Sequence, residues 1–311
     1  MKILISDTFE DEGIKIFEDH GFEVIKKFTI SKEELKNEIE EYDGIVVRSR
    51  TKLTADILEN AKNLKVIGRA GVGLDNIDLN KAAALKIEVL NTPEAPAVSV
   101  AELALGMMLA LARKISHADR TTHQGQWNKS QYLGYTLEGK KLGLVGFGNT
   151  AKHLAKIAIT MGMSVGVYSR FSKGQEAINE AKNIGCSIYS SVEDLLKDAQ
   201  IISLHLPATP QTENIVNEER LNIMRKDAII INTARGSLID ETALVKALES
   251  KKIAGAALDV YREEPLKNQD LMKCEENLIL TPHIASQSVE NQTAAAIMIA
   301  EKMSEFLKKF I

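Results

Sequence analysis

The chain has 311 residues, of which 44% are hydrophobic and 26% charged, and its formal net charge is −4. This composition excludes disordered and fibrous classes, and the length suits two domains rather than one. Acidic and basic residues are mixed along the chain without a basic stripe, so we expect no nucleic-acid partner. Cys186 and Cys274 lie far apart without nearby ligand residues, which predicts neither a disulfide framework nor a metal site.

The start of the chain shows no targeting segment. Residues from Met1 to Asp7 alternate as a strand does, and no charged leader with a following apolar segment precedes them. We therefore expect no signal peptide and a cytoplasmic protein. The longest apolar stretch, Val98 to Ala112, contains Glu102 and is too short for a bilayer, so it predicts a buried helix and no membrane partner.

The first third of the chain alternates short apolar runs with helical patterns. The apolar runs predict strands at residues 3–6, 45–48, 66–68 and 87–90. Such alternation is typical of a parallel sheet covered by helices. The breaker-rich segment 91–96 precedes a long apolar helix, predicted from Val100 to about His117, and we expect a domain boundary there.

A second alternating series follows this helix. It predicts strands at residues 141–146, 164–169, 200–205, 228–233, 254–260 and 277–281. Six such strands make a doubly wound sheet, so the fold class is α/β with two doubly wound parallel-sheet domains. The last stretch, Ser288 to Ile311, has helical periodicity and no following strand. We expect it to return to the first domain.

A strand-like run in the middle of the chain leads into the pattern G-x-G-x-x-A and then into a helix. Gly146 permits a tight turn, Gly148 lets backbone amides approach a pyrophosphate, and Ala151 allows close packing of helix on strand. Two glycines after a strand are also compatible with a purely structural turn. The next strand ends at Ser169 and Arg170, about twenty residues on, where a ribose-recognising residue belongs, so the pattern predicts dinucleotide binding.

Arg235, Glu264 and His283 each follow a different predicted strand of the second sheet, at the edge where open α/β sheets bind ligands. An arginine fork suits a carboxylate, and a histidine can give or take a proton near neutrality. A buried glutamate bonded to that histidine would orient its ring and favour its charged form. Each residue alone is compatible with a helix cap, a surface ion pair or a core histidine. Together they indicate hydride chemistry on a 2-keto acid.

The chain resembles the D-isomer-specific 2-hydroxyacid dehydrogenase family along nearly its whole length. The matching stretches lie, in order, at residues 46–51, 68–78, 91–102, 146–151, 205–207, 232–236, 259–265 and 281–284. Within the family they are most similar to members that oxidise 3-phosphoglycerate. The resemblance implies a Rossmann-type cofactor domain, residues 98–286, inserted into a flavodoxin-like substrate domain formed by residues 1–97 and 287–311.

The resemblance also implies which residues bind and react. It supports Arg235, Glu264 and His283 as the catalytic residues. The residues that it assigns to the substrate are Arg48, Arg69, Ala70, Gly71, Val72 and Gly73. Those that it assigns to the dinucleotide are Gly146, Gly148, Asn149, Thr150, Ser169, Arg170, His205, Leu206, Pro207, Thr212, Thr233, Ala234, Asp259 and Ala285.

Two positions depart from the family members that use NAD. Ser169 stands where those members carry an aspartate, and Ala151 replaces the third glycine. An aspartate would repel a 2′-phosphate, whereas Ser169 and the following Arg170, Ser172 and Lys173 can donate bonds to one. The cofactor is therefore expected to be NADP or NAD, with NADP favoured.

The leading functional hypothesis is oxidation of 3-phosphoglycerate in serine biosynthesis, supported by the arginines at 48 and 69. Lys129 follows Trp127 in a region where some members present an arginine to the substrate phosphate across a dimer. A glyoxylate or hydroxypyruvate reductase is the alternative, and a dinucleotide-sensing co-repressor is a distant one. Longer members continue into regulatory domains where this sequence stops, so we expect no inhibition by serine.

We expect the protein to form a homodimer and to act on a small-molecule 2-hydroxy or 2-keto acid. The predicted helix from Val100 to His117 carries more apolar side chains than one face of a single domain requires. These side chains are Leu103, Leu105, Met107, Met108, Leu109 and Leu111. Packing of this helix on several sides within one subunit is the alternative.

Overall fold

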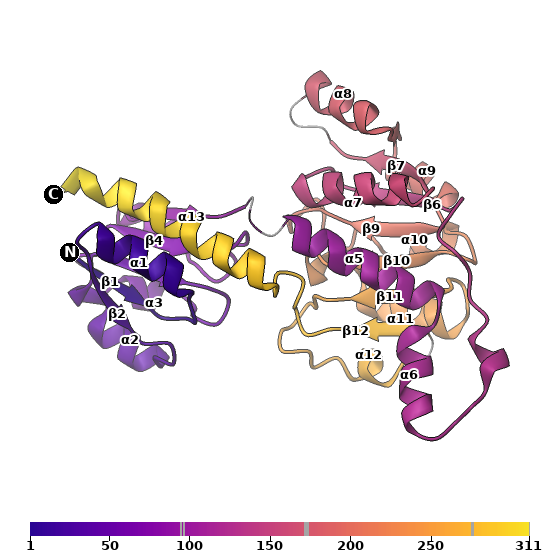
Figure 1. Cartoon of the computed structure of the whole chain (residues 1–311), viewed down its shortest axis with the longest axis horizontal. Helices are drawn as coiled ribbons and strands as arrows, with labels where there is room; N and C mark the ends of the chain where they lie inside the picture. Colours follow the sequence, from indigo (N-terminus) through magenta and orange to yellow (C-terminus); the bar gives the residue numbers. More distant parts are fainter. Residues whose placement is uncertain (94, 96, 171–173, 275–276, 311) are drawn as a thin grey trace. The chain divides into compact units, whose positions relative to one another are not determined.

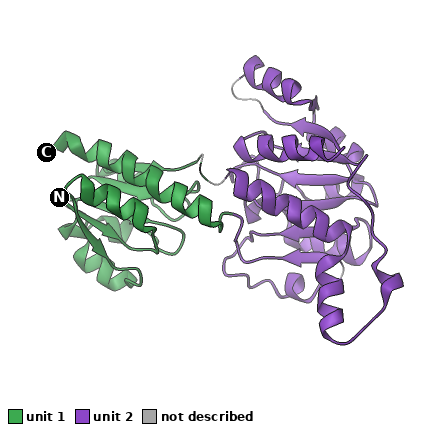
Figure 2. Ribbon diagram, viewed as in Figure 1, with its two compact units in different colours: residues 1–96, 286–311 green, residues 97–285 purple. Residues whose placement is uncertain are grey.

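The computed structural model describes residues 1–93, 95, 97–170, 174–274 and 277–310. The chain divides into two compact units, unit 1 with residues 1–96 and 286–311 and unit 2 with residues 97–285 (Figure 2). Each unit has a parallel sheet covered by helices, which confirms the predicted α/β class with two parallel-sheet domains. No helix among these residues is long and apolar enough to cross a membrane.

The sheet of unit 1 has the order β2-β1-β3-β4-β5, which is the flavodoxin-like order (Figure 1). Its strands are β1 (Lys2–Ile5), β2 (Glu23–Lys26), β3 (Gly44–Val47), β4 (Val66–Arg69) and β5 (Glu88–Asn91). Its helical elements are α1 (Asp11–Asp19), α2 (Lys32–Glu38), η1 (Ile39–Glu41), α3 (Ala55–Leu58), α4 (Leu79–Ala84), α13 (Val289–Leu307) and η4 (Lys308–Phe310). The sequence did not predict β2, whose residues are exposed or only partly buried, so it lacks a continuous apolar run.

The terminal helix α13 packs directly on the sheet of unit 1. A Cβ atom at Gly68 in β4 would lie 2.1 Å from the sulfur of Met303 and 2.9 Å from Cγ1 of Ile299. Both α13 side chains are fully buried. Because glycine lets the helix approach the strand, residues from the two ends of the sequence share one core.

The sheet of unit 2 has the order β12-β11-β10-β9-β6-β7-β8. Counted from β6 this is the Rossmann order 3-2-1-4-5-6, followed by one further strand. Its strands are β6 (Lys141–Val145), β7 (Ser164–Tyr168), β8 (Ser187–Ile188), β9 (Ile201–Leu204), β10 (Ile229–Asn232), β11 (Gly255–Leu258) and β12 (Leu278–Leu280). The sequence did not predict β8, which is two residues long.

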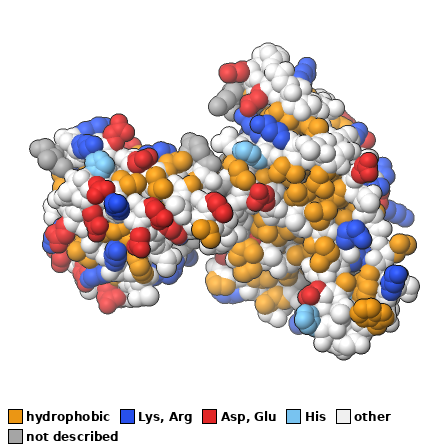
Figure 3. All heavy atoms as spheres, in the orientation of Figure 1, with side chains coloured by type: hydrophobic (Ala, Val, Ile, Leu, Met, Phe, Trp, Pro, Cys, Tyr) orange, Lys and Arg blue, Asp and Glu red, His pale blue; other side chains and the backbone are white. Residues whose placement is uncertain are grey.

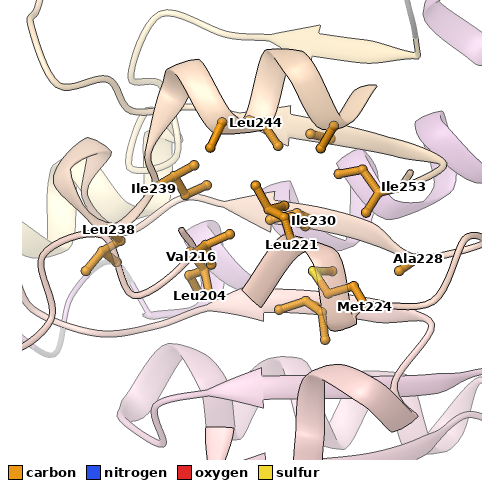
Figure 4. Packing of buried hydrophobic residues seen from close by; sticks show 14 of the residues in the cluster. Leu204, Val216, Leu221, Met224, Ala228, Ile230, Leu238, Ile239, Leu244 and Ile253 are labelled. Atoms are coloured by element: carbon orange, nitrogen blue, oxygen red, sulfur yellow. The ribbon is translucent and has the colours of Figure 1, made fainter. Parts of the chain in front are cut away.

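The helices of unit 2 cover both faces of its sheet. They are α5 (Ala97–Ala112), α6 (Ile115–His123), η2 (Lys129–Tyr132), α7 (Asn149–Thr160), α8 (Gln175–Ile184), α9 (Val192–Asp198), α10 (Glu218–Ile223), η3 (Gly236–Leu238), α11 (Glu241–Glu249) and α12 (Gln269–Lys273). On one face Leu204 and Ile230 pack against Leu221 of α10 and Leu244 of α11 (Figure 4). The core on the other face includes residues of α5 and α7. Burial on both faces explains why these strands read as continuous apolar runs.

The prediction of one helix from Val100 to His117 is wrong. Helix α5 ends at Ala112, and Lys114 has a left-handed backbone, with φ 54°, before α6 begins at Ile115. The amide of Tyr135 donates to the carbonyl of Ala112 at 3.0 Å. In a continuous helix this carbonyl would accept from the amide four residues further along the chain. A distant segment therefore ends α5, which sequence periodicity does not reveal.

Candidate active site

The glycine-rich loop connects β6 to α7, with Gly148 as the residue that precedes the helix. Gly146 has φ +103°, and a Cβ atom there would lie 2.2 Å from the carbonyl oxygen of His205. The loops after β6 and β9 thus approach each other at the point where the strand order reverses, and only glycine fits between them. The amino-terminal end of α7 opens at this point, which suits an anionic group.

The loop after β9 is held by its own side chains. The hydroxyl of Thr212 is buried, lies 2.7 Å from the carbonyl oxygen of Pro207 and accepts a bond from the amide of Thr209 at 2.9 Å. Nε2 of His205 lies 2.9 Å from Oγ of Ser203, and burial lowers the pKa of His205 to about 4. His205 is therefore neutral near physiological pH, and Thr212 shapes the loop.

The end of β7 lies beside the glycine-rich loop, because the amide of Gly146 donates to the carbonyl of Tyr168 at 2.8 Å. Ser169 is partly buried and Arg170 is exposed. Ser172 and Lys173, the other two candidate donors to a 2′-phosphate, lie outside the described residues. The structure thus places a hydroxyl and a cationic side chain where the second strand of a dinucleotide-binding sheet ends.

Arg235 lies on a turn that Asn232 shapes after β10. The amide group of the Asn232 side chain donates to the carbonyl of Arg235 at 2.9 Å, and its oxygen accepts from the amide of Ala234 at 3.1 Å. The neighbouring Thr233 is buried, and its hydroxyl has no hydrogen-bond partner among the described residues. This turn therefore carries the guanidinium group of Arg235 and, two residues before it, the buried hydroxyl of Thr233.

His283 and Glu264 form a direct pair at the same edge of the sheet. Nδ1 of His283 lies 2.7 Å from Oε2 of Glu264, and the other carboxylate oxygen accepts from the amide of Tyr261 at 3.1 Å. The side chain of Glu264 is 37% exposed, so the expectation that this glutamate is buried is wrong. The expected bond to the histidine is present.

The pKa of Glu264 is lowered below its usual value by groups of this site. Partial burial acts in the opposite direction and raises this pKa, but the hydrogen bond and charge of His283, the Tyr261 amide and the charge of Arg235 outweigh it. Glu264 is therefore ionised at neutral pH. His283 and Arg235 therefore both act electrostatically on the carboxylate of Glu264.

Asp259 and Tyr261 hold the loops that carry this group. Asp259 is fully buried and accepts bonds from the hydroxyl of Thr281 at 2.5 Å and from the amides of Ile284 and Ala285, each at 2.8 Å. The hydroxyl of Tyr261 lies 2.8 Å from the carbonyl oxygen of Thr281. Asp259 and Ala285, two of the residues that the resemblance assigned to the dinucleotide, thus bond to each other.

Gly236 brings the Arg235 turn against the backbone that leads to Glu264. A Cβ atom at Gly236 would lie 1.9 Å from the carbonyl carbon of Tyr261. Sequence reasoning did not single out Asn232 or Tyr261 as site residues. Asn232 could have been found, because it is the polar residue that ends the apolar run of β10. Nothing in the sequence indicates that the hydroxyl of Tyr261 reaches the next loop.

In unit 1 the residues assigned to the substrate follow two neighbouring strands, since Val47 pairs with Arg69 in the parallel register of β3 and β4. The guanidinium of Arg69 donates to the carbonyl of Ala70 at 3.0 Å and to the hydroxyl of Ser49 at 3.1 Å. Gly71 has φ +141°, and a Cβ atom there would lie 1.3 Å from this guanidinium. Glycine thus lets Arg69 fold over its own loop.

The loop from Ala70 to Gly73 is fixed from β5. The side chain of Asn91 donates to the carbonyl of Val72 at 2.7 Å, and the amide of Thr92 donates to the carbonyl of Gly71 at 2.9 Å. Arg48 is largely buried and contacts Glu10 and the carbonyl of Thr8. Two arginines and a loop of two glycines therefore line the carboxyl edge of this sheet, which suits an anionic ligand.

Comparison with known proteins shows a match over residues 105–285 to the model of the D-isomer specific 2-hydroxyacid dehydrogenase NAD binding domain. A D-3-phosphoglycerate dehydrogenase of Methanocaldococcus jannaschii is 42% identical over 99% of the chain, and the chain spans 58% of that relative. A hydroxypyruvate reductase of Thermotoga maritima is 40% identical over 97% of each chain. The crystal structure of the TT0316 protein from Thermus thermophilus superposes with a TM-score of 0.88 at 33% identity, covering 99% of this chain and 97% of that one.

His205 should make the folded state sensitive to acid. Its pKa of about 4 when folded lies below the value of 6.5 for an ordinary histidine, so between these pH values the unfolded chain binds a proton that the folded chain does not. The contribution of neutral His205 to folding stability is fully present above pH 6.5 and is lost as the pH falls toward 4. Between these two pH values we expect the free energy of unfolding to fall by about 2–3 kcal/mol more in the parent than in His205→Gln, as measured by urea unfolding. Equal losses would show that His205 is not the responsible group.

Proposed function

The chain belongs to the D-isomer specific 2-hydroxyacid dehydrogenase family, and from this we propose that it interconverts a D-2-hydroxy acid and its 2-keto acid with a nicotinamide dinucleotide. The observation that carries the proposal is the bond between Glu264 and His283, with the charge of Arg235 acting on the same carboxylate. The chain spans about half the length of the phosphoglycerate dehydrogenases that it matches, from 48% to 58%.

The residues of unit 2 fit a dinucleotide. Gly146 leaves the space that a Cβ atom would fill, α7 begins beside it, and the buried hydroxyl of Thr233 lacks a partner among the described residues. We propose that Gly146, Gly148, Asn149 and Thr150 hold the pyrophosphate, and that Ser169 and Arg170 hold the ribose end. The loop from His205 to Pro207, Thr233 and Ala234 would line the site, and Thr212, Asp259 and Ala285 would shape it. When bound, the nicotinamide ring supplies or accepts the hydride.

The three catalytic residues would divide the remaining work. Arg235 binds the substrate carboxylate and polarises the neighbouring carbonyl oxygen. Because Nδ1 of His283 faces Glu264, Nε2 is the ring nitrogen that gives a proton to the developing alkoxide or takes one from the hydroxyl. Glu264 keeps the ring oriented through its bond to Nδ1 of His283. The hydride is thus gained or lost at C2, and the proton at the oxygen bound to C2.

Replacement of the proton donor tests this function. We expect His283→Gln to lower turnover by roughly 10²–10⁴ while leaving the dissociation constant of the dinucleotide within a few-fold. His123→Gln, the same change at an exposed histidine of α6, is the matched control and should keep parental turnover. If the turnover of His283→Gln stayed within a few-fold of the parental value, the assignment of His283 as the proton donor would be wrong.

The substrate that we propose first is 3-phosphoglycerate, with the reaction placed in serine synthesis in the cytoplasm. The phosphoglycerate dehydrogenase relative at 42% identity and the arginines at 48 and 69 support it. We propose that Arg48, Arg69 and the loop of Ala70, Gly71, Val72 and Gly73 bind acid groups of the substrate. A hydroxypyruvate or glyoxylate reductase is the second candidate, supported by the hydroxypyruvate reductase relative at 40% identity.

We propose NADP(H) as the preferred cofactor. Ser169 and the exposed Arg170 follow β7, where an aspartate would repel a 2′-phosphate. A hydroxyl and a guanidinium group can both donate to phosphate oxygens, and the guanidinium bond is charge-assisted. If Arg170 faces only water instead, NAD(H) would be held equally well through its pyrophosphate.

Kinetics with the two cofactors decide between these alternatives. A charged hydrogen bond contributes roughly 1.5–3 kcal/mol, so kcat/KM for NADPH should exceed that for NADH by about ten- to a hundredfold. In the double variant Ser169→Asp with Arg170→Ala, the added carboxylate repels the phosphate and the preference should reverse. A parent enzyme that already prefers NADH tenfold would disprove NADP selectivity.

We propose that the protein is a homodimer, through a surface that differs in part from the one expected from the sequence. Met107, Met108 and Leu111 are buried in the core of unit 2, so they add nothing to an exposed face. Trp127 and Leu133 instead are 86% and 83% exposed. In Figure 3, hydrophobic side chains also gather over the part of unit 2 where α5 lies. Apolar surface of this extent is typical of subunit contacts.

Sedimentation tests the dimer. The parent should sediment as a species of twice 34.3 kDa at micromolar concentration. Trp127→Glu combined with Leu133→Glu should shift it toward the monomer, because the contact would bury unpaired charges. A parent that sediments at 34.3 kDa would rule out the dimer at this concentration.

A further inference from the structure

Arg48 lies at the carboxyl edge of the sheet in unit 1, between two other strand ends that carry polar residues. Strand β3, which precedes Arg48, pairs with β1 on one side and with β4 on the other. Asp7 follows β1, and Arg69 ends β4. The charges of this edge therefore decide which anionic group of a substrate it can accept.

Glu10 is the acidic side chain that Arg48 contacts. The NH2 nitrogen of Arg48 lies 3.4 Å from Oε2 of Glu10, and the NH1 nitrogen lies 3.5 Å from Oε1. These contacts are longer than the distances of about 2.7–2.9 Å typical of tight charged hydrogen bonds. The arginine side chain is 15% exposed and the glutamate side chain 26%, so water screens the pair weakly. Glu10 thus balances the charge of Arg48 without saturating its donors.

Capping of α1 does not explain the position of Glu10. Glu10 is the residue that precedes α1, but its side chain accepts no bond from an amide of the helix. Asp11 and Glu12 already place negative charge in the first turn. Its Oε2 atom is buried and has no hydrogen-bond partner within the described part of the chain, so its charge is met by the ion pair.

The pKa of Arg48 agrees with this role. Burial lowers the pKa of its guanidinium, and the charge and hydrogen bond of Glu10, together with the charge of Asp7, act against this effect. The negative charge of Glu10 therefore stabilises a cation that is partly removed from water. An anionic substrate group that binds Arg48 must share it with this carboxylate.

We propose that Glu10 is a specificity-determining residue that reduces the positive charge offered to a second anionic group of the substrate, and so sets the choice between phosphorylated and non-phosphorylated 2-hydroxy acids. The inference rests on the proposed function, in which Arg48 binds an acid group. A carboxylate a few ångströms from a bound dianion opposes its binding much more than it opposes that of an uncharged hydroxyl group. Removal of the carboxylate should therefore favour the phosphorylated acid selectively.

The test compares 3-phosphoglycerate with D-glycerate, which differ only in the phosphate. In Glu10→Gln the ratio of kcat/KM for the phosphorylated acid to kcat/KM for the other should rise about tenfold, as expected for one charge at this distance and burial. Glu10→Ala should change the ratio in the same direction. Glu12→Gln, which removes the same charge from an exposed residue of the same helix, should leave the ratio within twofold.

A second background shows whether the charge of Glu10 acts on the substrate itself or only through Arg48. With Arg48→Gln already present, adding Glu10→Gln should still raise the ratio, because the repulsion between the carboxylate and a bound dianion does not need the arginine. An unchanged ratio in that background overturns the proposal. So does an unchanged or lower ratio in Glu10→Gln alone, which would mean that the carboxylate merely holds Arg48 in place.

Failure of the proposed function is distinguished by a binding measurement. If the parent oxidises neither acid, the proposed substrates are wrong, and the dissociation constants of the two acids measured by calorimetry still test Glu10. The same tenfold change in their ratio is expected for Glu10→Gln, and its absence rejects the role of Glu10.

Discussion

The buried carboxylate of Asp259 is the group on which the arrangement of the candidate active site depends. A charge that is fully removed from water must be met by hydrogen bonds, and the donors here are the hydroxyl of Thr281 and the amides of Ile284 and Ala285. All three belong to the loop that follows β12. His283 lies between them, so its place is fixed by a side-chain bond from Thr281 on one side and by two amide bonds on the other.

Unit 1 repeats this principle at its own sheet edge. Asp7 is 4% exposed and accepts bonds from the amide of Arg48 at 2.5 Å, the hydroxyl of Thr51 at 2.9 Å and Nε of Arg50 at 2.9 Å. In each unit a buried aspartate after one strand therefore fixes the loop after the neighbouring strand, and that loop carries a residue proposed to bind or react. Fixed backbone positions allow the charged side chains to be oriented without a large entropic cost on binding.

The sequence predicted most strands because burial on both faces leaves continuous apolar runs, and it failed at β2 and β8, which have none. The positions of Arg235, Glu264 and His283 at one sheet edge were predictable because each residue follows such a run. The contacts of Glu10 were not, since a glutamate before a helix is ordinarily a surface residue. Nor was the break between α5 and α6, because it depends on a bond from Tyr135, more than twenty residues downstream. Long-range pairing leaves no periodic signal.

The proposed reaction, hydride transfer to C2 of a 2-keto acid, is tested most directly by following deuterium. The enzyme would be given NADPH or NADH with both hydrogens at C4 of the nicotinamide replaced by deuterium, and hydroxypyruvate or its 3-phosphate as the acceptor. Mass spectrometry and chiral chromatography would then locate the label and identify the product. We predict one deuterium at C2 of a D-2-hydroxy acid. A product without deuterium, or a product of L configuration, would contradict the proposed chemistry.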